Sequence, residues 1–223
     1  MTSKIAGNPR RARLPRSVRR KQLLAAAQEV FVANGYHAAA MDDIAERAGV
    51  SKPVLYQHFP GKLDLYLAIL DTHAATLIKS IRKGLAATDD NKARVRNVLT
   101  SYFDFVDGAD RGDDGVFRLL FESDFANEPA VRERMDRISK QSTDAVAETV
   151  ASDTALPRAQ AELLAGALTG AAQVAARWWL ESDRAVPKAD AVRLMAELQW
   201  RGISHFPLHP AEADGPAQTA EVR

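Results

Sequence analysis

The chain has 223 residues, of which 46% are hydrophobic, and its 30 Lys and Arg against 29 Asp and Glu give a formal net charge of +1. This length and composition allow a sizeable core in one or two helical units, and the near-neutral charge excludes a protein that is basic throughout. The absence of cysteine excludes disulfides, thiolate metal sites and cysteine nucleophiles. No stretch has the apolar length of a secretory signal or a membrane span, so we expect a cytoplasmic protein with no membrane partner.

The stretch before Glu29 contains basic but no acidic side chains. Its basic residues are Lys4, Arg10, Arg11, Arg13, Arg16, Arg19, Arg20 and Lys21. Such a block suits the release of counterions from nucleic-acid phosphates, and a solvated tail is the alternative. We expect residues 1–15, which include Gly7, Pro9 and Pro15, to be a disordered basic tail.

From Arg16 onward the apolar residues follow helical spacing, and no convincing strand pattern or internal repeat appears. Proline and glycine separate the expected helices. These about nine helices cover roughly residues 16–34, 41–48, 52–59, 62–86, 91–107, 114–126, 128–153, 158–183 and 188–205. The pattern predicts an all-α protein with a three-helix head at 16–61, a helical bundle for ligand binding and dimerisation at 62–206, and a flexible tail at 207–223.

Three closely spaced helices make up the predicted head. Gly35 is expected to end the first as a left-handed cap, and Gly49 to form a tight turn with positive φ after the second. Ser51 is the expected N-cap of the third, with its hydroxyl bonded to a backbone N–H. Leu55 and Phe59 lie one turn apart on this third helix and should face inward.

The third helix is therefore expected to expose a polar face, which is the geometry of a helix-turn-helix whose second helix enters the major groove. Gln57 can read adenine through two hydrogen bonds, and Val54 can touch a thymine methyl. The neighbouring polar residues are better placed for phosphates, which position the protein without specifying sequence. The alternative is a helical hairpin whose polar residues are only solvated. The candidate DNA-binding residues are Ala40, Lys52, Pro53, Val54, Tyr56, Gln57, His58 and Lys62.

The run GYHAAAMDDIAERAGVSKPVLYQHFPGKLDLYLAIL, residues 35–70, closely resembles the DNA-binding domain of the TetR family. The segments IAERAGVSK and LYQHF and the lysine after them sit at family spacing, which makes the match highly specific. The resemblance implies phosphate contacts from Tyr56, His58 and Lys62. Family members usually carry Thr or Ser before the second helix, where this chain has Ala40. That Thr or Ser usually touches a phosphate and caps the helix. Ala40 can do neither, so the resemblance does not extend to this phosphate contact, and the helix lacks a cap worth ~1 kcal/mol.

The helix that starts at Lys62 leads from the head into the predicted body, which makes it the natural lever between the two. Large aromatic residues opposite small Ala and Gly residues could leave a cavity in the body, and a fully packed core is the alternative. TetR-like bodies usually hold a small-molecule pocket, so the resemblance favours the cavity. The expected lining residues are Leu99, Phe103, Phe117, Leu120, Phe121, Phe125, Leu164, Leu168, Ala171 and Trp178.

Two further stretches, FRLLFESDFANEP and the region from WWLESD to DAVRLMAELQWRGISHFPL, extend the resemblance toward residue 208. Together with residues 35–70 they look like the actinobacterial TetR-type regulators of fatty-acid synthesis (FasR type). That resemblance implies a long-chain acyl-CoA as the effector, with its acyl chain in an apolar tunnel, and no cofactor. One alternative is an efflux repressor with a cationic or aromatic ligand, and another is a constitutive DNA-binding module without an effector.

The resemblance also implies a homodimer formed by the last two helices. Such a dimer would bind a near-palindromic double-stranded operator, with its recognition helices about 34–36 Å apart. The candidate interface residues are Ala172, Arg177, Val192, Met195, Leu198, Gln199 and Trp200. Burial in the core is an equal alternative for Trp200.

No motif of an enzyme or a metal site stands out. The acidic stretch DGADRGDDG, residues 107–115, lacks the oxygen ligands of a calcium loop at its third and fifth positions. The five histidines are too scattered to suggest a metal site, and no catalytic signature is present. We therefore expect neither catalysis nor a metal.

Overall fold

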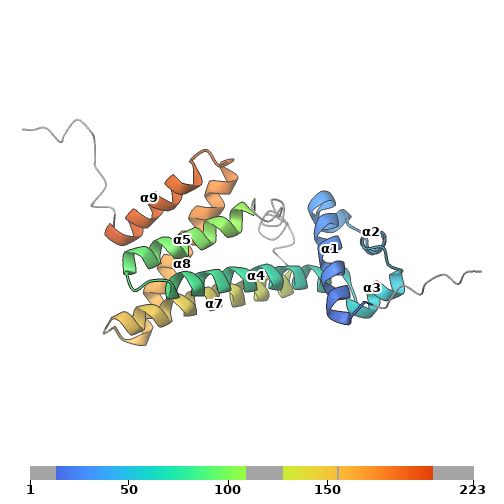
Figure 1. Cartoon of the computed structure of the whole chain (residues 1–223), viewed down its shortest axis with the longest axis horizontal. Coiled ribbons are helices and arrows are strands. Elements are labelled where there is room, and N and C mark those ends of the chain that lie inside the picture. The colour runs from blue at the N-terminus through green and yellow to red at the C-terminus, as the bar shows by residue number, and fades with distance from the viewer. Residues whose placement is uncertain (1–13, 109–127, 155, 203–223) are drawn as a thin grey trace, which may run out of the picture. The chain divides into compact units, whose positions relative to one another are not determined.

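The computed structural model describes residues 14–108, 128–154 and 156–202, and all regular structure in these ranges is helical (Figure 1). The described helices are α1 (Arg16–Ala38), α2 (Met41–Arg47), α3 (Lys52–His58), α4 (Lys62–Ala86), α5 (Asn91–Asp107), α7 (Pro129–Asp153), α8 (Arg158–Glu181) and α9 (Lys188–Arg201). The predicted all-α class is confirmed, and the predicted bounds of these helices are correct to within a few residues. The predicted helix at 114–126 and the two predicted tails lie outside the described residues, apart from the last residues of the first tail.

Two compact units divide the described chain. The first comprises residues 14–74 and 128–135, and the second comprises residues 75–108, 136–154 and 156–202. Helices α4 and α7 each contribute their first part to the first unit and their remainder to the second. Ion pairs join α4 to α7 within each unit, between Asp71 and Arg134 in the first and between Arg82 and Glu148 in the second.

The core of the first unit forms around the apolar face of α1. Leu23, Ala27 and Phe31 are buried there at intervals of four residues, the spacing of one helix face. Ile44 of α2 and Leu55 of α3 are equally buried, and α1 packs on α2 and α2 on α3. Burial of these apolar side chains fixes the three helices of the head relative to one another.

Glycine sets both turns of the head. At Gly35, φ is 75° and ψ is 162°, so α1 is broken there and continues for only one more turn. The predicted positive φ is correct, but this ψ is extended, so the predicted left-handed helical cap is wrong. Gly49 has a φ of 63°, and the N–H groups of Gly49 and Val50 donate to the carbonyls of Glu46 and Ala45 at 2.9 and 3.0 Å. These two bonds form a Schellman motif, which ends α2 and directs the chain into α3.

The starts of α2 and α3 differ from the expected side-chain caps. Ser51 is the N-cap residue of α3, as predicted, but its hydroxyl makes no cap bond, and the Val54 N–H donates to the Ser51 carbonyl at 3.0 Å instead. Ala40 precedes α2 and has no side-chain acceptor, but the Asp43 carboxylate accepts the Ala40 N–H at 3.3 Å. Asp43 thus supplies half of a capping box and places negative charge at the positive end of the helix dipole.

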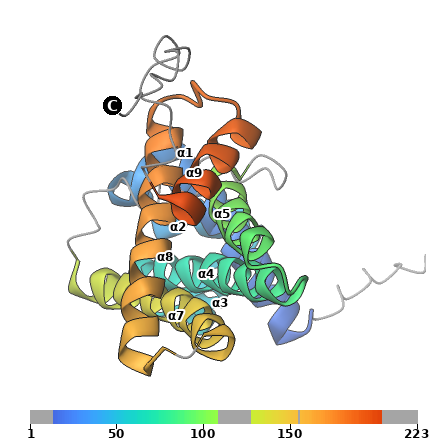
Figure 2. The ribbon, with the colours of Figure 1, turned by 90° about the vertical axis from the view of Figure 1, so that its left-hand side faces the viewer.

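In the second unit α5 packs against both α8 and α9 (Figures 1 and 2). Small residues of α8 face inward, which allows a close approach of the helices. The buried residues of α8 are Ala161, Ala165, Thr169, Ala172, Ala176, Trp179 and Leu180. The Trp179 ring lies 5.4 Å from the Phe103 ring of α5, and its Nε1–H donates to the Val186 carbonyl at 2.6 Å. A buried indole with a satisfied N–H anchors the end of α8.

A charge cluster pins the connection between α8 and α9 to the end of α5. Asp107 accepts from the Arg184 Nε at 2.9 Å and from the Lys188 Nζ at 3.0 Å, and Lys188 also pairs with Asp104. Burial by itself would raise the pKa of Asp107, but the hydrogen bonds from Lys188 and Arg184 hold this pKa below its ordinary value. Asp183 and Arg184 both adopt positive φ in this connection, at 55° and 57°. Such a conformation costs free energy in residues other than glycine, and the ion pairs of Asp107 offset that cost.

Candidate DNA-binding surface and body pocket

Helix α3 presents the predicted reading face to solvent. Leu55 and Phe59 are fully buried, which confirms the predicted inward face. The opposite face is open: Lys52, Pro53, Tyr56 and Gln57 are exposed, and Val54 and His58 are partly exposed. The side chains that could meet DNA are therefore held on a helix whose other side is fixed in the core.

Basic residues of α1 lie beside this face. Residues from both helices line one hollow of about 580 Å³, in which polar lining predominates. Its lining residues are Leu14, Arg16, Arg19, Val54, Gln57 and His58. Sequence reasoning placed the arginines in a basic block but not in the site. The signal that could have found them is the absence of any acidic residue before Glu29.

Hydrogen bonds connect this basic edge to the turn of the head. Arg19 Nη1 donates to Gln22 Oε1 at 2.8 Å, and Gln22 Nε2 donates to the Ala48 carbonyl at 2.7 Å. Arg20 lies over the Phe59 ring at 4.2 Å, where the ring face attracts its charge. The guanidinium groups are thereby positioned by residues of the head and remain at its surface.

His58 lies among these arginines. Burial lowers its pKa below the ordinary value of 6.5, and the charges of Arg16, Arg20 and Arg19 lower it further. The neutral imidazole therefore predominates at neutral pH, and it can donate one N–H to a phosphate oxygen. A phosphate bound beside His58 would reverse the effect of the arginines, because an anion stabilises the protonated ring.

Two lysines that were predicted to contact phosphates bind other groups of the head in this structure. The Lys52 Nζ pairs with Asp42 of α2 at 2.6 Å, and this interaction raises the Lys52 pKa. The Lys62 Nζ donates to the carbonyls of His37 and Ala39 at 3.1 and 2.9 Å, and it lies over the ring of Tyr36. In this structure Lys62 thus holds the turn before α2, and a phosphate contact remains a prediction for both lysines.

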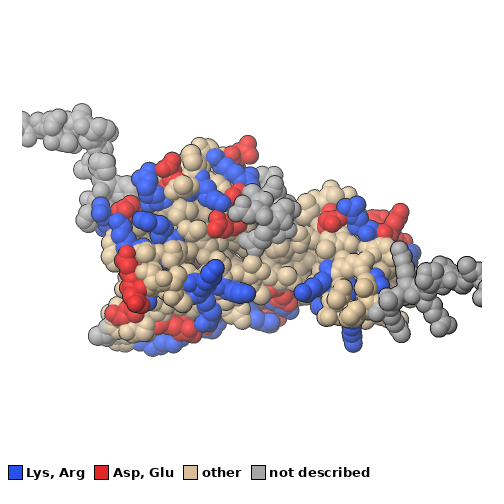
Figure 3. All heavy atoms as spheres, viewed as in Figure 1, with Lys and Arg blue, Asp and Glu red and all other residues tan. Residues whose placement is uncertain are grey.

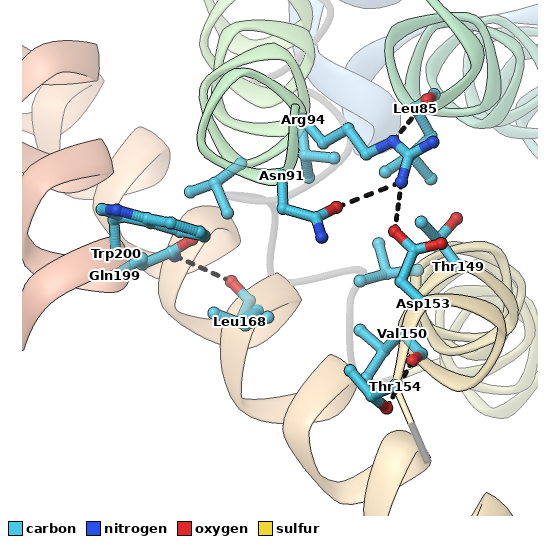
Figure 4. Close-up of a pocket in the computed structure, with 13 residues that line it drawn as sticks. Leu85, Asn91, Arg94, Thr149, Val150, Asp153, Thr154, Leu168, Gln199 and Trp200 are labelled. Atoms are coloured by element: carbon cyan, nitrogen blue, oxygen red, sulfur yellow. Dashed lines mark hydrogen bonds and ion pairs between the residues drawn. The ribbon is translucent and has the colours of Figure 1, made fainter. Parts of the chain in front are cut away.

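The second unit contains a mostly apolar pocket with a volume of about 290 Å³ (Figure 4). We call it the body pocket. It lies where α4 and α7 end and α5 begins, with one wall from α8 and α9. It is lined by Leu85, Asn91, Arg94, Val95, Val98, Val146, Thr149, Val150, Asp153, Thr154, Leu168, Gln199 and Trp200. Its volume lies just below the ~300–1,000 Å³ range of small-molecule sites.

The charged groups at the body pocket neutralise each other. Arg94 pairs with Asp153, and its Nε donates to the carbonyls of Leu85 and Thr88 at 3.0 and 2.7 Å (Figure 4). Its Nη1 also donates to Asn91 Oδ1 at 3.1 Å. Trp200 and Gln199 lie on the other side of the pocket in Figure 4. Because the arginine and the carboxylate satisfy each other, the part of a ligand that this pocket favours is apolar.

The structure places the predicted ligand residues differently from expectation. Leu168 lines the body pocket, while Leu99 and Phe103 are buried in the core and do not line it. Leu164, Ala171 and Trp178 are exposed, so their expected inward orientation is wrong. The other four candidates, Phe117, Leu120, Phe121 and Phe125, lie outside the described residues.

The exposed side of α8 carries large apolar side chains. Trp178 is 67% exposed, whereas the adjacent Trp179 is 7% exposed, so our expectation took the wrong tryptophan as the inward one. Leu163, Leu164 and Val174 are exposed with Trp178. We call these four residues the α8 outer face.

The predicted dimer residues divide by burial. Ala172 is fully buried and Val192 nearly so, which places both in the packing of their own chain and corrects the expectation for Ala172. Arg177 is exposed and pairs with Glu181. The remaining candidates are the partly exposed Met195, Leu198 and Gln199 and the exposed Trp200. For these residues an interface role remains a prediction.

The face of the second unit that Figure 3 draws shows no further concentration of one kind of charged side chain that would suggest another site. Figure 3 shows acidic and basic side chains interspersed over the drawn face of the second unit. Within the described ranges no group of three or more His, Asp and Glu residues could hold a metal ion. None of the helices that the structure describes has both the length and the apolar character needed to cross a membrane.

A polar recognition helix after a glycine turn, flanked by arginines, defines a helix-turn-helix DNA-binding protein. The family model of bacterial regulatory proteins, tetR family, matches residues 23–69, and the model of the tetracyclin repressor-like C-terminal domain matches residues 92–202. The HTH-type transcriptional activator FasR of Mycolicibacterium smegmatis is 46% identical over 202 residues, which cover 91% of this chain and 90% of that protein. The chain belongs to the TetR family and is a DNA-binding transcriptional regulator, not an enzyme.

Solved structures share the same fold. A TetR-like transcriptional regulator from Rhodococcus sp. RHA1 is 28% identical, with a TM-score of 0.63 over 87% of this chain and 100% of that one. The transcriptional regulator FadR from Bacillus subtilis, in complex with stearoyl-CoA, has a TM-score of 0.68 at 19% identity over 82% of this chain and 98% of that one.

Proposed function

We propose that this regulator senses lipid metabolism: a long-chain acyl-CoA modulates its binding to a near-palindromic operator, and its targets are genes of lipid or fatty-acid synthesis. The observation that carries the proposal is the body pocket. It is an apolar hollow in a unit whose sequence is extensively similar to FasR. The similarity of fold to a FadR protein that binds stearoyl-CoA supports the same class of ligand.

The lining of the body pocket fits an acyl chain better than a charged drug. Its apolar residues come from α4, α5, α7, α8 and α9, and they include Leu85, Val98 and Val146. A cationic ligand, as for an efflux repressor, would need a free carboxylate. Asp153 is a carboxylate that lines the pocket, but Arg94 neutralises it. An acyl chain needs no such partner, and the CoA group of the same ligand would remain in solvent or at the surface.

We further propose that α3 and the start of α1 bind the operator together. Gln57 and Val54 would read base edges, while Tyr56, His58 and Arg19 would contact phosphates. The hollow that both helices line supports this division of roles, because it brings basic and base-reading side chains to one surface.

The α8 outer face would join two copies of the chain. Leu163, Val174 and Trp178 expose apolar surface on one side of a helix, and solvent alone does not stabilise such a surface. Gly166 and Gly170 lie on α8 as well, and a Cβ added at either would meet no atom within 4 Å. Another helix can therefore approach α8 closely at these positions. A dimer would carry two recognition helices, as a near-palindromic operator requires.

The test of the ligand is a titration of the protein–operator complex with a long-chain acyl-CoA, with the matching free fatty acid and with CoA alone. We expect the acyl-CoA to change the operator affinity. The size of the change is set by how differently the acyl-CoA binds the operator-bound and the operator-free protein. A matched variant, Val98→Asp, places a charge in the body pocket and should abolish the response while operator binding persists. Operator binding that no acyl-CoA disturbs would discard the lipid role and leave the DNA role intact.

A further inference from the structure

Hydroxyl groups of the second unit form pairs between helices, with Ser101 and Thr169 buried and Ser80 at the surface. Ser80 of α4 and Ser101 of α5 lie with their oxygens 3.0 Å apart, and so do Thr143 of α7 and Thr169 of α8. Ser101 also donates to the Asn97 carbonyl at 3.0 Å, so its hydroxyl is satisfied within its own helix. Such groups are uncommon in an otherwise apolar core, because each must find a partner away from water.

Among the described residues, Ser142 of α7 is a buried hydroxyl that lacks such a partner, and Tyr102 of α5 lies beside it. Ser142 is 1% exposed, and its Oγ has no hydrogen bond of regular geometry. The Tyr102 hydroxyl is its polar neighbour: burial raises the Tyr102 pKa, and interaction with Ser142 lowers it in part. The unsatisfied Ser142 oxygen thus lies in the interior beside Tyr102, and an unsatisfied buried polar group makes further apolar contact unfavourable.

The helical register places each residue of this pair one turn from a residue that lines the body pocket. Val98 of α5 and Val146 of α7 line the pocket. Tyr102 follows Val98 by one turn, and Ser142 precedes Val146 by one turn. Because the pocket lies at the start of α5 and the end of α7, both steps lead inward from it.

We propose that Tyr102 and Ser142 form a polar floor of the body pocket and thereby limit the length of the acyl chain that it accepts. This inference rests on the proposed function, in which the pocket holds an acyl chain. A chain that ends above the floor can lie against the apolar part of the lining, such as Leu85, Val95 and Val98. A longer chain must separate the two hydroxyls and leave both in contact with methylene groups. The pair therefore selects against chains that are long enough to reach the floor, without touching the thioester or the CoA group.

The experiment measures the dissociation constants of saturated acyl-CoA thioesters by titration calorimetry, with chains that grow by two carbons at a time. For the wild-type protein, affinity should rise about fourfold for each added methylene and then stop rising at one chain length. In the double variant Tyr102→Phe/Ser142→Ala the rise should continue to chains at least one step longer. The control is Ser101→Ala, which removes a hydroxyl that already has partners. It should not change the chain length at which the affinity stops rising, which we call the break.

Thermal unfolding of the same variants gives an independent readout. Ser142→Ala removes an unsatisfied buried oxygen and should leave the melting temperature unchanged or raise it, whereas Ser101→Ala should lower it. If the double variant does not fold, Ser142→Ala alone should still move the break. The inference is overturned if the break occurs at the same chain length in the variants that lack the hydroxyls. It is also overturned if the affinity of the wild-type protein shows no break. No binding of any acyl-CoA to the wild type overturns the proposed ligand itself.

Discussion

Helices α3 and α8 both expose one face, but the chemistry of the two faces is opposite. The outer face of α3 carries Lys52, Tyr56 and Gln57, while that of α8 carries Leu163 and Trp178. The inner faces differ as well, since α3 and its C-cap residue bury Leu55 and Phe59, whereas α8 buries mostly alanine. The four large apolar side chains of the α8 outer face therefore point away from the core, while Trp179 and Leu180 near the end of α8 are buried.

This difference separates two kinds of recognition. A polar face flanked by arginines attracts a polyanion, so its affinity depends on salt and on base sequence. A helix face of exposed leucine, valine and tryptophan gains free energy by removal from water, so its affinity depends little on salt. We infer that α3 meets DNA and that α8 meets a second copy of the chain. Substitutions at Leu163, Gln57, Tyr56 and Arg19 test that assignment, and one at Asp107 tests what anchors the end of α8.

The largest expected effect comes from a charge on the α8 outer face. Leu163→Asp should convert the dimer to a monomer, because an unpaired carboxylate would be buried at the interface. Operator affinity should then fall by about 10²–10⁴-fold, since each half-site must be bound independently. Sedimentation and operator binding measure the two effects. Val186→Asp, at an exposed apolar residue outside α8, is the control, and equal effects in both variants would contradict the role of α8.

The next largest effect is on stability. Asp107→Asn leaves Arg184 and Lys188 without their carboxylate partner and should lower the free energy of unfolding by about 2–3 kcal/mol near pH 7, allowing for their partial exposure. Because the folded-state pKa of Asp107 lies below its ordinary value of 3.8, the wild-type protein loses this stabilisation as the pH falls through that lowered pKa. The variant should therefore show a flatter loss of stability in acid.

Denaturant unfolding from neutral pH to below pH 4 measures this difference. Asp190→Asn is the matched control, because Asp190 pairs with Arg193 in an exposed position and should contribute less than about 1 kcal/mol. If both variants were destabilised equally, the cluster at Asp107 would not be what anchors the α8–α9 connection.

Base reading should show a smaller and more selective effect. Gln57→Ala should reduce discrimination at one base position of each half-site by about 1–3 kcal/mol. Tyr56→Phe should weaken binding to all operator sequences alike, because a hydrogen bond to a phosphate carries no sequence information. Binding to a panel of single-base operator variants separates the two. The division of roles is wrong if both substitutions change affinity and preference together.

The smallest effect concerns the basic edge of α1. Arg19→Ala should weaken operator binding and reduce the slope of log affinity against log salt by about 0.9 for each phosphate that Arg19 neutralises. Arg193→Ala removes the same charge from the second unit and should leave this slope unchanged. An equal change in both variants would mean that Arg19 acts only through net charge.

The head was predictable because its signals are local. Gly49, Leu55 and Phe59 each act within one or two turns of the chain, and the structure places all three as the pattern predicts. The engagement of Lys62 with the carbonyls before α2 was not predictable, because it joins residues 23 and 25 positions apart. The DNA contacts themselves remain predictions, since they depend on a partner.

The body was harder because α8 is apolar on two sides. Along most of its length one face of α8 carries leucine, valine and Trp178 and the other carries alanine, and hydrophobicity favours the larger residues as the core. The structure buries the alanines, since small side chains let α8 approach α5 closely. Apart from Leu168, the lining of the body pocket was not predicted, because it comes from the ends of four helices and the middle of α8, and their meeting depends on tertiary packing.

The most direct test of the two assigned faces is one salt series in which operator binding and self-association are measured on the same protein. We predict that operator affinity falls steeply with salt, whereas the dissociation constant of the dimer stays constant or decreases slightly. A dimer that dissociates with salt as steeply as the operator complex would contradict the assignment of α8 to an apolar self-interface. Operator binding that does not respond to salt would contradict the assignment of α3 and its arginines to DNA.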